Sequence, residues 1–145
     1  MQDIENFLNY GIFFNLLSTE KEKEEVVGLV RETCERIEEK NHGDMVVVLG
    51  NIEYIVYKKI IDNYGEHYGG ETGPLIFKNY CKCFIVYFSP LAVARSRNKQ
   101  LFALAHEFAH AYFGHPFESD QTSTQKEERE KQAQQKAIEW GFIEE

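Results

Sequence analysis

Two histidines and a glutamate stand close together in the stretch His106-Glu107-Phe108-Ala109-His110. On a helix, residues four apart lie one turn apart on the same side, so the imidazoles of His106 and His110 can reach a single ion. Glu107 projects at a neighbouring angle, near enough to touch a water on that ion without taking a ligand position. Zinc hydrolases are assembled in this way, because the metal lowers the pKa of its water and the carboxylate accepts the proton. We therefore predict a metal site here, with Glu107 as its catalytic carboxylate. The alternative is two hydrogen-bonded core histidines beside a glutamate on the helix surface.

A catalytic zinc normally has a third protein ligand, often a carboxylate. Near the end of the chain, four residues recur at helical spacing and form one stripe: Glu130, Ala133, Ala137 and Trp140. The small residues of this stripe would let its helix pack closely against the histidine helix, with Glu130 aimed inward. Glu127, one turn earlier, is the main rival, and His115 is a further candidate, either as a ligand or as a group beside the metal. We expect Glu130 to be the third ligand.

The elements that must position these side chains are two helices. From about residue 98 the apolar residues have a helical period up to Phe113 and leave almost no polar face, which predicts a helix that is buried nearly all round. Polar residues at 118–124 predict a surface loop. A final helix is expected over residues 125–140, with Gly141 ending it.

The first part of the chain predicts a helical lead-in over about residues 1–43. Residues 4–16 have helical spacing. Thr19 with Glu22 forms a capping-box pattern, which predicts the start of an amphipathic helix that ends at residues 41–43. The charged residues of this second helix are expected to be a solvated face.

The middle of the chain predicts strands and a loop. The β-branched run at 45–49 indicates a buried strand that Gly50 ends. Residues 52–60 favour a helix, although 54–57 would also suit a strand. The glycine-rich residues 64–74 predict a loop, and residues 75–77 and 83–88 predict two strands around a turn near residue 79.

Composition limits the class of protein. With 145 residues, the chain is expected to form a single domain, residues 1–145. Its formal net charge of −8 repels phosphate, so we expect no direct binding of nucleic acid. The start has no signal-peptide pattern, and the longest early apolar stretch is far too short to span a membrane. The three cysteines make no disulfide framework, so we expect a cytoplasmic protein with ordinary reduced thiols.

The histidine helix and the last helix resemble those of the ImmA/IrrE-type zincin-like metallopeptidases. The resemblance rests on residues 101–110 with Gly114 and His115, on the preceding strand pair, and on the Glu-x-x-Ala-x-x-x-Ala pattern at 130–137. It covers roughly residues 75–140. It implies a small zincin-like core, with His106 and His110 as Zn²⁺ ligands, Glu107 as the catalytic carboxylate and Glu130 as the third ligand. Some members of the family cleave a repressor protein. The chain departs from the family pattern at two positions of the last helix, Gln134 and Lys136, and in its ending at 138–142.

We therefore predict an α+β fold with N-terminal helices, a short mixed sheet, the buried histidine helix and a C-terminal helix that carries the third ligand. The predicted function is that of a zinc metalloendopeptidase, which hydrolyses peptide bonds of a protein or peptide substrate such as a transcriptional repressor. The strand at 83–88 is expected to be a sheet edge that aligns an extended substrate. One alternative is a non-catalytic zinc-binding regulatory or interaction domain. Another is a structural zinc site closed by four protein ligands, including His115 and Glu130.

Overall fold

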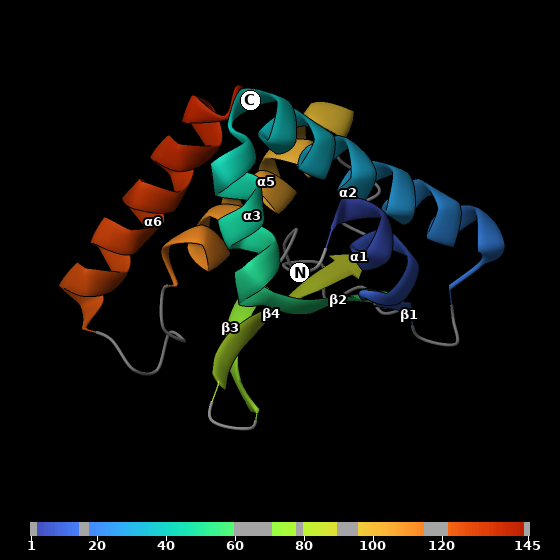
Figure 1. The fold of residues 1–145 in the computed structure, drawn as a ribbon, viewed down its shortest axis with the longest axis horizontal. Helices are drawn as coiled ribbons and strands as arrows, with labels where there is room; N and C mark the ends of the chain where they lie inside the picture. Colours follow the sequence, from blue (N-terminus) through green and yellow to red (C-terminus); the bar gives the residue numbers. More distant parts are fainter. Residues whose placement is uncertain are drawn as a thin grey trace.

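A computed structural model of the chain describes residues 3–14, 18–59, 71–77, 80–89, 96–114 and 122–143, with the backbone alone for 58–59, 71–77 and 80–89. The elements follow one another in this order: α1 (Ile4–Tyr10), β1 (Ile12–Phe14), α2 (Glu20–Lys40), α3 (His42–Asn51), β2 (Ile52–Lys59), β3 (Glu71–Phe77), β4 (Tyr80–Ser89), α5 (Arg97–Phe113) and α6 (Ser123–Glu139). Five helices and one sheet in this part of the chain confirm the predicted α+β fold at this level (Figure 1).

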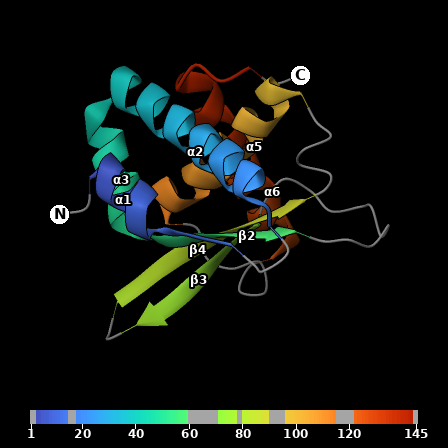
Figure 2. The ribbon, with the colours of Figure 1, turned by 90° about the vertical axis from the view of Figure 1, so that its right-hand side faces the viewer.

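The four described strands form one mixed sheet in the order β1-β2-β4-β3. β1 pairs with β2, and β2 with β4, in parallel, whereas β3 pairs antiparallel with β4. The predicted strand pair around residue 79 is therefore confirmed. The prediction that 83–88 is an edge strand is wrong, because β4 pairs with β2 on one side and with β3 on the other. The outer strands of the described sheet are β1 and β3. Figure 2 shows the sheet as the lower layer, with the helices stacked above it.

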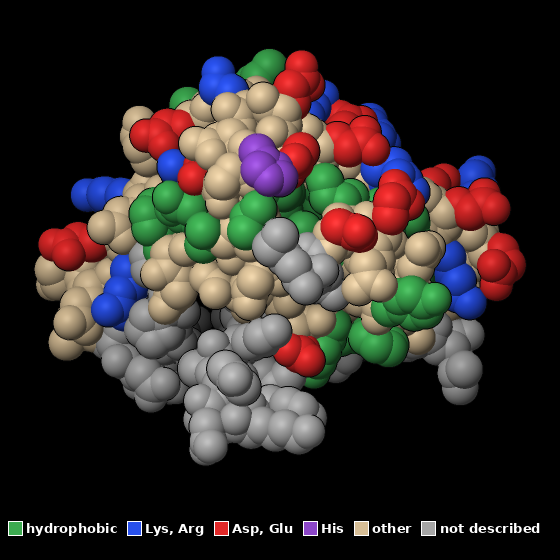
Figure 3. All heavy atoms as spheres, in the orientation of Figure 1, with side chains coloured by type: hydrophobic (Ala, Val, Ile, Leu, Met, Phe, Trp, Pro, Cys, Tyr) green, Lys and Arg blue, Asp and Glu red, His purple; other side chains and the backbone are tan. Residues whose placement is uncertain are grey.

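Helix α2 begins as its capping box predicts. The Thr19 hydroxyl accepts a hydrogen bond from the Glu22 backbone N–H (3.1 Å), and the Glu22 carboxylate accepts one from the Thr19 N–H (3.2 Å). One face of the helix is buried, with Val30, Cys34 and Ile37 fully inaccessible. The outer face is charged, and acidic and basic side chains mix along the edge of the molecule where α2 runs (Figure 3). Both the helix and its solvated face agree with the sequence prediction.

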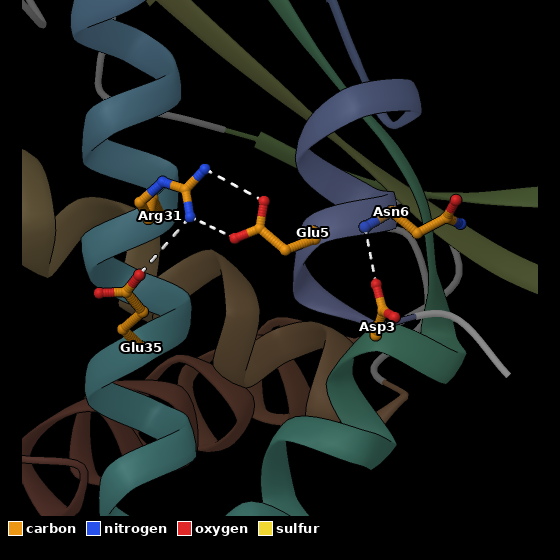
Figure 4. Close-up of polar contacts among 5 residues, drawn as sticks. All are labelled: Asp3, Glu5, Asn6, Arg31 and Glu35. Carbon is orange, nitrogen blue, oxygen red and sulfur yellow. Dashed lines mark hydrogen bonds and ion pairs between the residues drawn. The ribbon is translucent and has the colours of Figure 1, made fainter.

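An ion pair fixes α1 against α2. Both terminal nitrogens of the Arg31 guanidinium, Nη1 and Nη2, donate to the Glu5 carboxylate, and the carboxylate of Glu35, one turn along α2, lies 3.7 Å from Nη1 (Figure 4). These groups are substantially exposed to solvent, so the pair orients α1 more than it stabilises the fold. Asp3 caps α1 by accepting a hydrogen bond from the Asn6 N–H (2.7 Å).

The predicted helix over residues 4–16 ends at Tyr10 and is wrong for 11–14, while 15–16 lie outside the described residues. At Gly11 the chain passes so close to Phe7 that a Cβ atom there would lie 2.7 Å from the phenyl ring. The Gly11 carbonyl accepts a hydrogen bond from the Ile55 N–H (2.7 Å), which starts the pairing of β1 with β2. Pairing with a distant strand therefore overrides the local helical spacing.

The predictions for residues 45–60 are wrong in both halves. The run at 45–49 lies in α3, because the Asn41 side chain accepts a hydrogen bond from the Asp44 N–H (3.0 Å) and starts a new helix directly after α2. Residues 52–59 form β2, in the middle of the sheet, which is the strand alternative. Of the predicted loop at 64–74, residues 71–74 belong to β3, and 64–70 lie outside the described residues.

The core lies between the helices and the sheet. Buried side chains from α1, α2, α3, β2, α5 and α6 form one hydrophobic cluster, with Phe7, Tyr57 and Phe108 among its largest members. Helix α5 contacts α2, α3 and α6, so the histidine helix lies among the other helices (Figure 1). Among the described residues, no helix is long and apolar enough to cross a membrane.

Candidate metal centre

Helix α5 places the two histidines on one side, one turn apart. The helix begins at Ser96, whose hydroxyl accepts a hydrogen bond from the Lys99 N–H (3.3 Å), and it ends at Gly114, which has a φ of 67° that favours glycine. Leu101, Leu104 and Phe108 are buried, but the helix is not buried nearly all round as predicted, because its first turn and Phe113 are exposed. His106 and His110 meet edge to face, with ring centroids 4.8 Å apart and their Nε2 atoms 3.1 Å apart.

Helix α6 brings Glu130 to the same point. One Glu130 carboxylate oxygen lies 2.8 Å from His106 Nε2, and the other lies 3.1 Å from His110 Nε2. The close approach of the helices is possible because Ala133 and Ala137, on the same side of α6, are fully buried and small. The stripe of residues read from the sequence is therefore the contact face of α6. His106, His110 and Glu130 can each offer one ligand atom within 4.8 Å of the others.

The charge of the cluster favours a cation. Hydrogen bonds from His106 and His110 hold the pKa of the Glu130 carboxyl well below its usual range, against the opposing effect of burial. The cluster is also within reach of solvent, because the side chains of His106, His110 and Glu130 are 19%, 11% and 48% exposed. An ion could reach the three donors without unfolding the helices.

The donors suit zinc in type and in spacing. Two imidazole nitrogens and one carboxylate oxygen are a set that catalytic zinc takes, and donors about 2.0–2.1 Å from a tetrahedral ion lie about 3.3 Å from one another. The two Nε2 atoms lie 3.1 Å apart, and each lies 2.8 to 3.1 Å from a different oxygen of the Glu130 carboxylate. With one atom from each residue, the three donors lie within 4.8 Å of one another. Two imidazole nitrogens that both point a lone pair at the other repel, so the same arrangement without a metal needs a proton between them. A single cation satisfies all three donors.

The other predicted site residues occupy different positions. Glu107 lies on α5 beside the histidines, is only 9% exposed, and is outside the donor group of three. Glu127 is an exposed residue on α6, one turn before Glu130, and is also outside the group. The loop candidate His115 lies outside the described residues. The structure therefore brings Glu130, and not Glu127, to the two histidines.

Sequence reasoning missed the helix that holds α5 and α6 in place. The Asn51 side chain, at the end of α3, donates a hydrogen bond to the Ala111 carbonyl near the end of α5 (2.8 Å). Asp44, in the first turn of α3, accepts a hydrogen bond from Trp140 Nε1 (2.9 Å) and pairs with Lys136 of α6 (3.1 Å). The spacing of Asn41 and Asp44, a helix-capping residue and an acidic residue three positions later, is a local signal that could have revealed the start of α3.

Comparisons with known proteins add no relative. No family model matches the chain, and no curated protein or solved structure is significantly similar to it.

Proposed function

We propose that the chain is a zinc-dependent peptidase with a zincin-like core, in which His106, His110 and Glu130 hold the metal and Glu107 is the general base. The observation that carries this proposal is the convergence of the three donors from two helices, with Glu130 24 residues after His106 in sequence. The resemblance to the ImmA/IrrE-type peptidases assigns the same roles to these residues. A protein or peptide substrate, such as a transcriptional repressor, is part of the proposal.

Zinc held by these residues would supply a Lewis acid that lowers the pKa of a water and polarises a peptide carbonyl. Glu107, which follows His106 directly on α5, would accept the proton of the attacking water. Its protonated carboxyl would then give that proton to the leaving amine. Because Glu107 is largely shielded from solvent, water would screen its interaction with the bound zinc only weakly.

The substrate would bind as an extended segment along β3. Among the described strands, β3 is an outer strand and contacts α5, whereas β4 pairs with a strand on each side. A free strand edge offers backbone N–H and C=O groups that can pair with a peptide.

The test begins with zinc quantification on the purified protein, followed by cleavage of an unfolded protein such as casein. We expect one zinc per chain, no zinc in His106→Ala, and cleavage that chelation removes and zinc restores. Glu107→Gln should keep the zinc and lower cleavage by about 10²- to 10⁴-fold, because it lacks a general base. Equal zinc in the wild type and His106→Ala would refute the metal site. Full cleavage by a zinc-loaded Glu107→Gln variant would refute the role of Glu107, and a zinc-loaded wild type without any cleavage would favour the non-catalytic alternative.

A further inference from the structure

Asp44 of α3 and Lys136 of α6 form an ion pair that is mostly shielded from solvent. Their side chains are 11% and 16% exposed, and Lys136 Nζ lies 3.1 Å from Asp44 Oδ2. The same oxygen accepts a hydrogen bond from Trp140 Nε1 (2.9 Å). The ammonium group also lies 4.6 Å from the centre of the Tyr112 ring and 3.2 Å from the Glu139 carboxylate. Side chains from α3, from α5 and from the C-terminal end of α6 therefore meet at this ion pair.

The packing between α5 and α6 does not by itself fix the rotation of α6 about its own axis. Ala133 and Ala137 permit close approach, but two methyl groups interlock poorly with a neighbouring helix and resist its rotation weakly. With a helix radius of about 5–6 Å, a rotation of about 10° moves the helix surface by about 1 Å. Metal–ligand distances tolerate only about 0.2 Å. Glu130 can remain a ligand only if the rotation of α6 is fixed elsewhere.

Lys136 and Trp140 lie one turn apart at the end of α6, and both contact Asp44. The end of α6 is therefore attached to α3 at two positions along its length. We propose that the Asp44–Lys136 ion pair is a positioning device that sets the rotation of α6 and so holds Glu130 against the two histidines. This inference rests on the proposed metal site. It assigns a role to Lys136, which is one of the departures from the family pattern.

Positioning and simple electrostatics predict opposite effects on metal affinity. Removing a positive charge near a cation site favours the cation, so a purely electrostatic Lys136→Met change would tighten metal binding. Loss of position would weaken it, because Glu130 no longer reaches the ion. Lys131→Met is the matched control, since Lys131 is an exposed lysine on the same helix, next to Glu130 in sequence.

The experiment uses the full chain loaded with Co²⁺, whose visible absorption reports the number and type of ligands, together with zinc affinity from competition with a chelator. Glu130→Gln should change the absorption band and weaken zinc binding by about tenfold or more. Lys136→Met should reproduce both changes. Lys131→Met should keep the wild-type band and bind zinc at least as tightly as the wild type. In the Glu130→Gln background, Lys136→Met should have no additional effect, because it acts through Glu130.

The double variant Asp44→Asn with Lys136→Met guards against misfolding, because it leaves no unpaired buried charge. It should remain folded by circular dichroism and still give the band of Glu130→Gln. If Lys136→Met or this double variant keeps the wild-type band and affinity, the positioning role is overturned. If the wild type binds no Co²⁺, the metal site itself fails, and this inference fails with it, so the two failures are distinguishable.

Discussion

Zinc should stabilise the folded chain through the three donors, and the size of the effect can be worked out. A ligand that binds only the folded state adds RT ln(1 + [L]/Kd), which is about 2.7 kcal/mol when free zinc is 100 times Kd. An unfolding entropy of about 2.1 cal/mol/K per residue over 145 residues gives about 0.3 kcal/mol/K. One kcal/mol therefore moves Tm by about 3 °C, and zinc at this level should raise Tm by about 9 °C.

A comparison of two carboxylates on α6 tests which of them is the third ligand. Glu130 lies 2.8 Å from His106 Nε2, whereas Glu127 is exposed and outside the donor group. Loss of a group that supports a metal ligand costs about 10- to 100-fold in metal affinity, so loss of the Glu130 ligand itself should weaken binding at least as much. At the same free zinc, Glu130→Gln should then gain at most about 0.4–1.4 kcal/mol, or about 1–5 °C. Glu127→Gln makes the same chemical change and should keep the full shift.

The assay is differential scanning fluorimetry or calorimetry of each variant with and without zinc, at a free zinc concentration fixed by a chelator buffer. Each variant is compared with its own metal-free form, so changes in intrinsic stability cancel. His106→Ala should show no shift. The reasoning is refuted if Glu130→Gln retains the wild-type shift, or if Glu127→Gln loses it to the same extent.

Three further predictions concern groups outside the donor set. Burial raises the pKa of Asp44, but hydrogen bonds from Trp140 and Lys136 outweigh burial and hold this pKa below its usual value. The ionised Asp44 therefore stabilises the fold above about pH 4, and this contribution is lost as the pH falls further. In denaturant titrations from about pH 6 to about pH 3, the free energy of unfolding should depend less on pH for Asp44→Asn than for the wild type, and equal slopes would contradict this. Thr19→Ala removes the α2 cap and should lower the free energy of unfolding by about 1 kcal/mol, whereas Thr19→Ser, which keeps the hydroxyl, should be close to the wild type; urea titrations measure both. Burial raises the pKa of the Cys34 thiol to about 12, so iodoacetamide at pH 8 should modify Cys34 only after denaturation, and mass spectrometry showing rapid modification of the native chain would contradict this.

The histidine helix and the last helix could be predicted because their signals are local. The apolar period around His106 and His110 gave the burial of α5, and the stripe from Glu130 to Trp140 gave the contact face of α6. The starts were less accurate: α6 begins at Ser123, two residues before the predicted start, because Thr122 and Gln125 form a capping box.

Residues 41–59 show where local patterns fail. A short apolar run such as 45–49 fits a buried strand or a buried helix equally well by periodicity. The decisive group was Asn41, which ends α2 with its backbone and starts α3 with its side chain. Once α3 takes residues 42–51, the next residues are placed against β1 and β4, and pairing with two strands outweighs a weak helical spacing.

The site has a local part and a distant part, and these differ in what sequence alone can reveal. The histidine pair depends on a spacing of four residues within one helix. The position of Glu130 depends on contacts between α6 and two other helices, and the Asp44–Trp140 bond joins residues 96 positions apart. In the sequence, Lys136 reads only as a departure from the family pattern, whereas in the fold it is the partner of Asp44. Because an ion pair removed from solvent stabilises only when both partners are present, the residue suitable at position 136 depends on the residue at position 44. A motif scan treats these positions as independent, so a mismatch at 136 does not by itself count against the metal site that Glu130 completes.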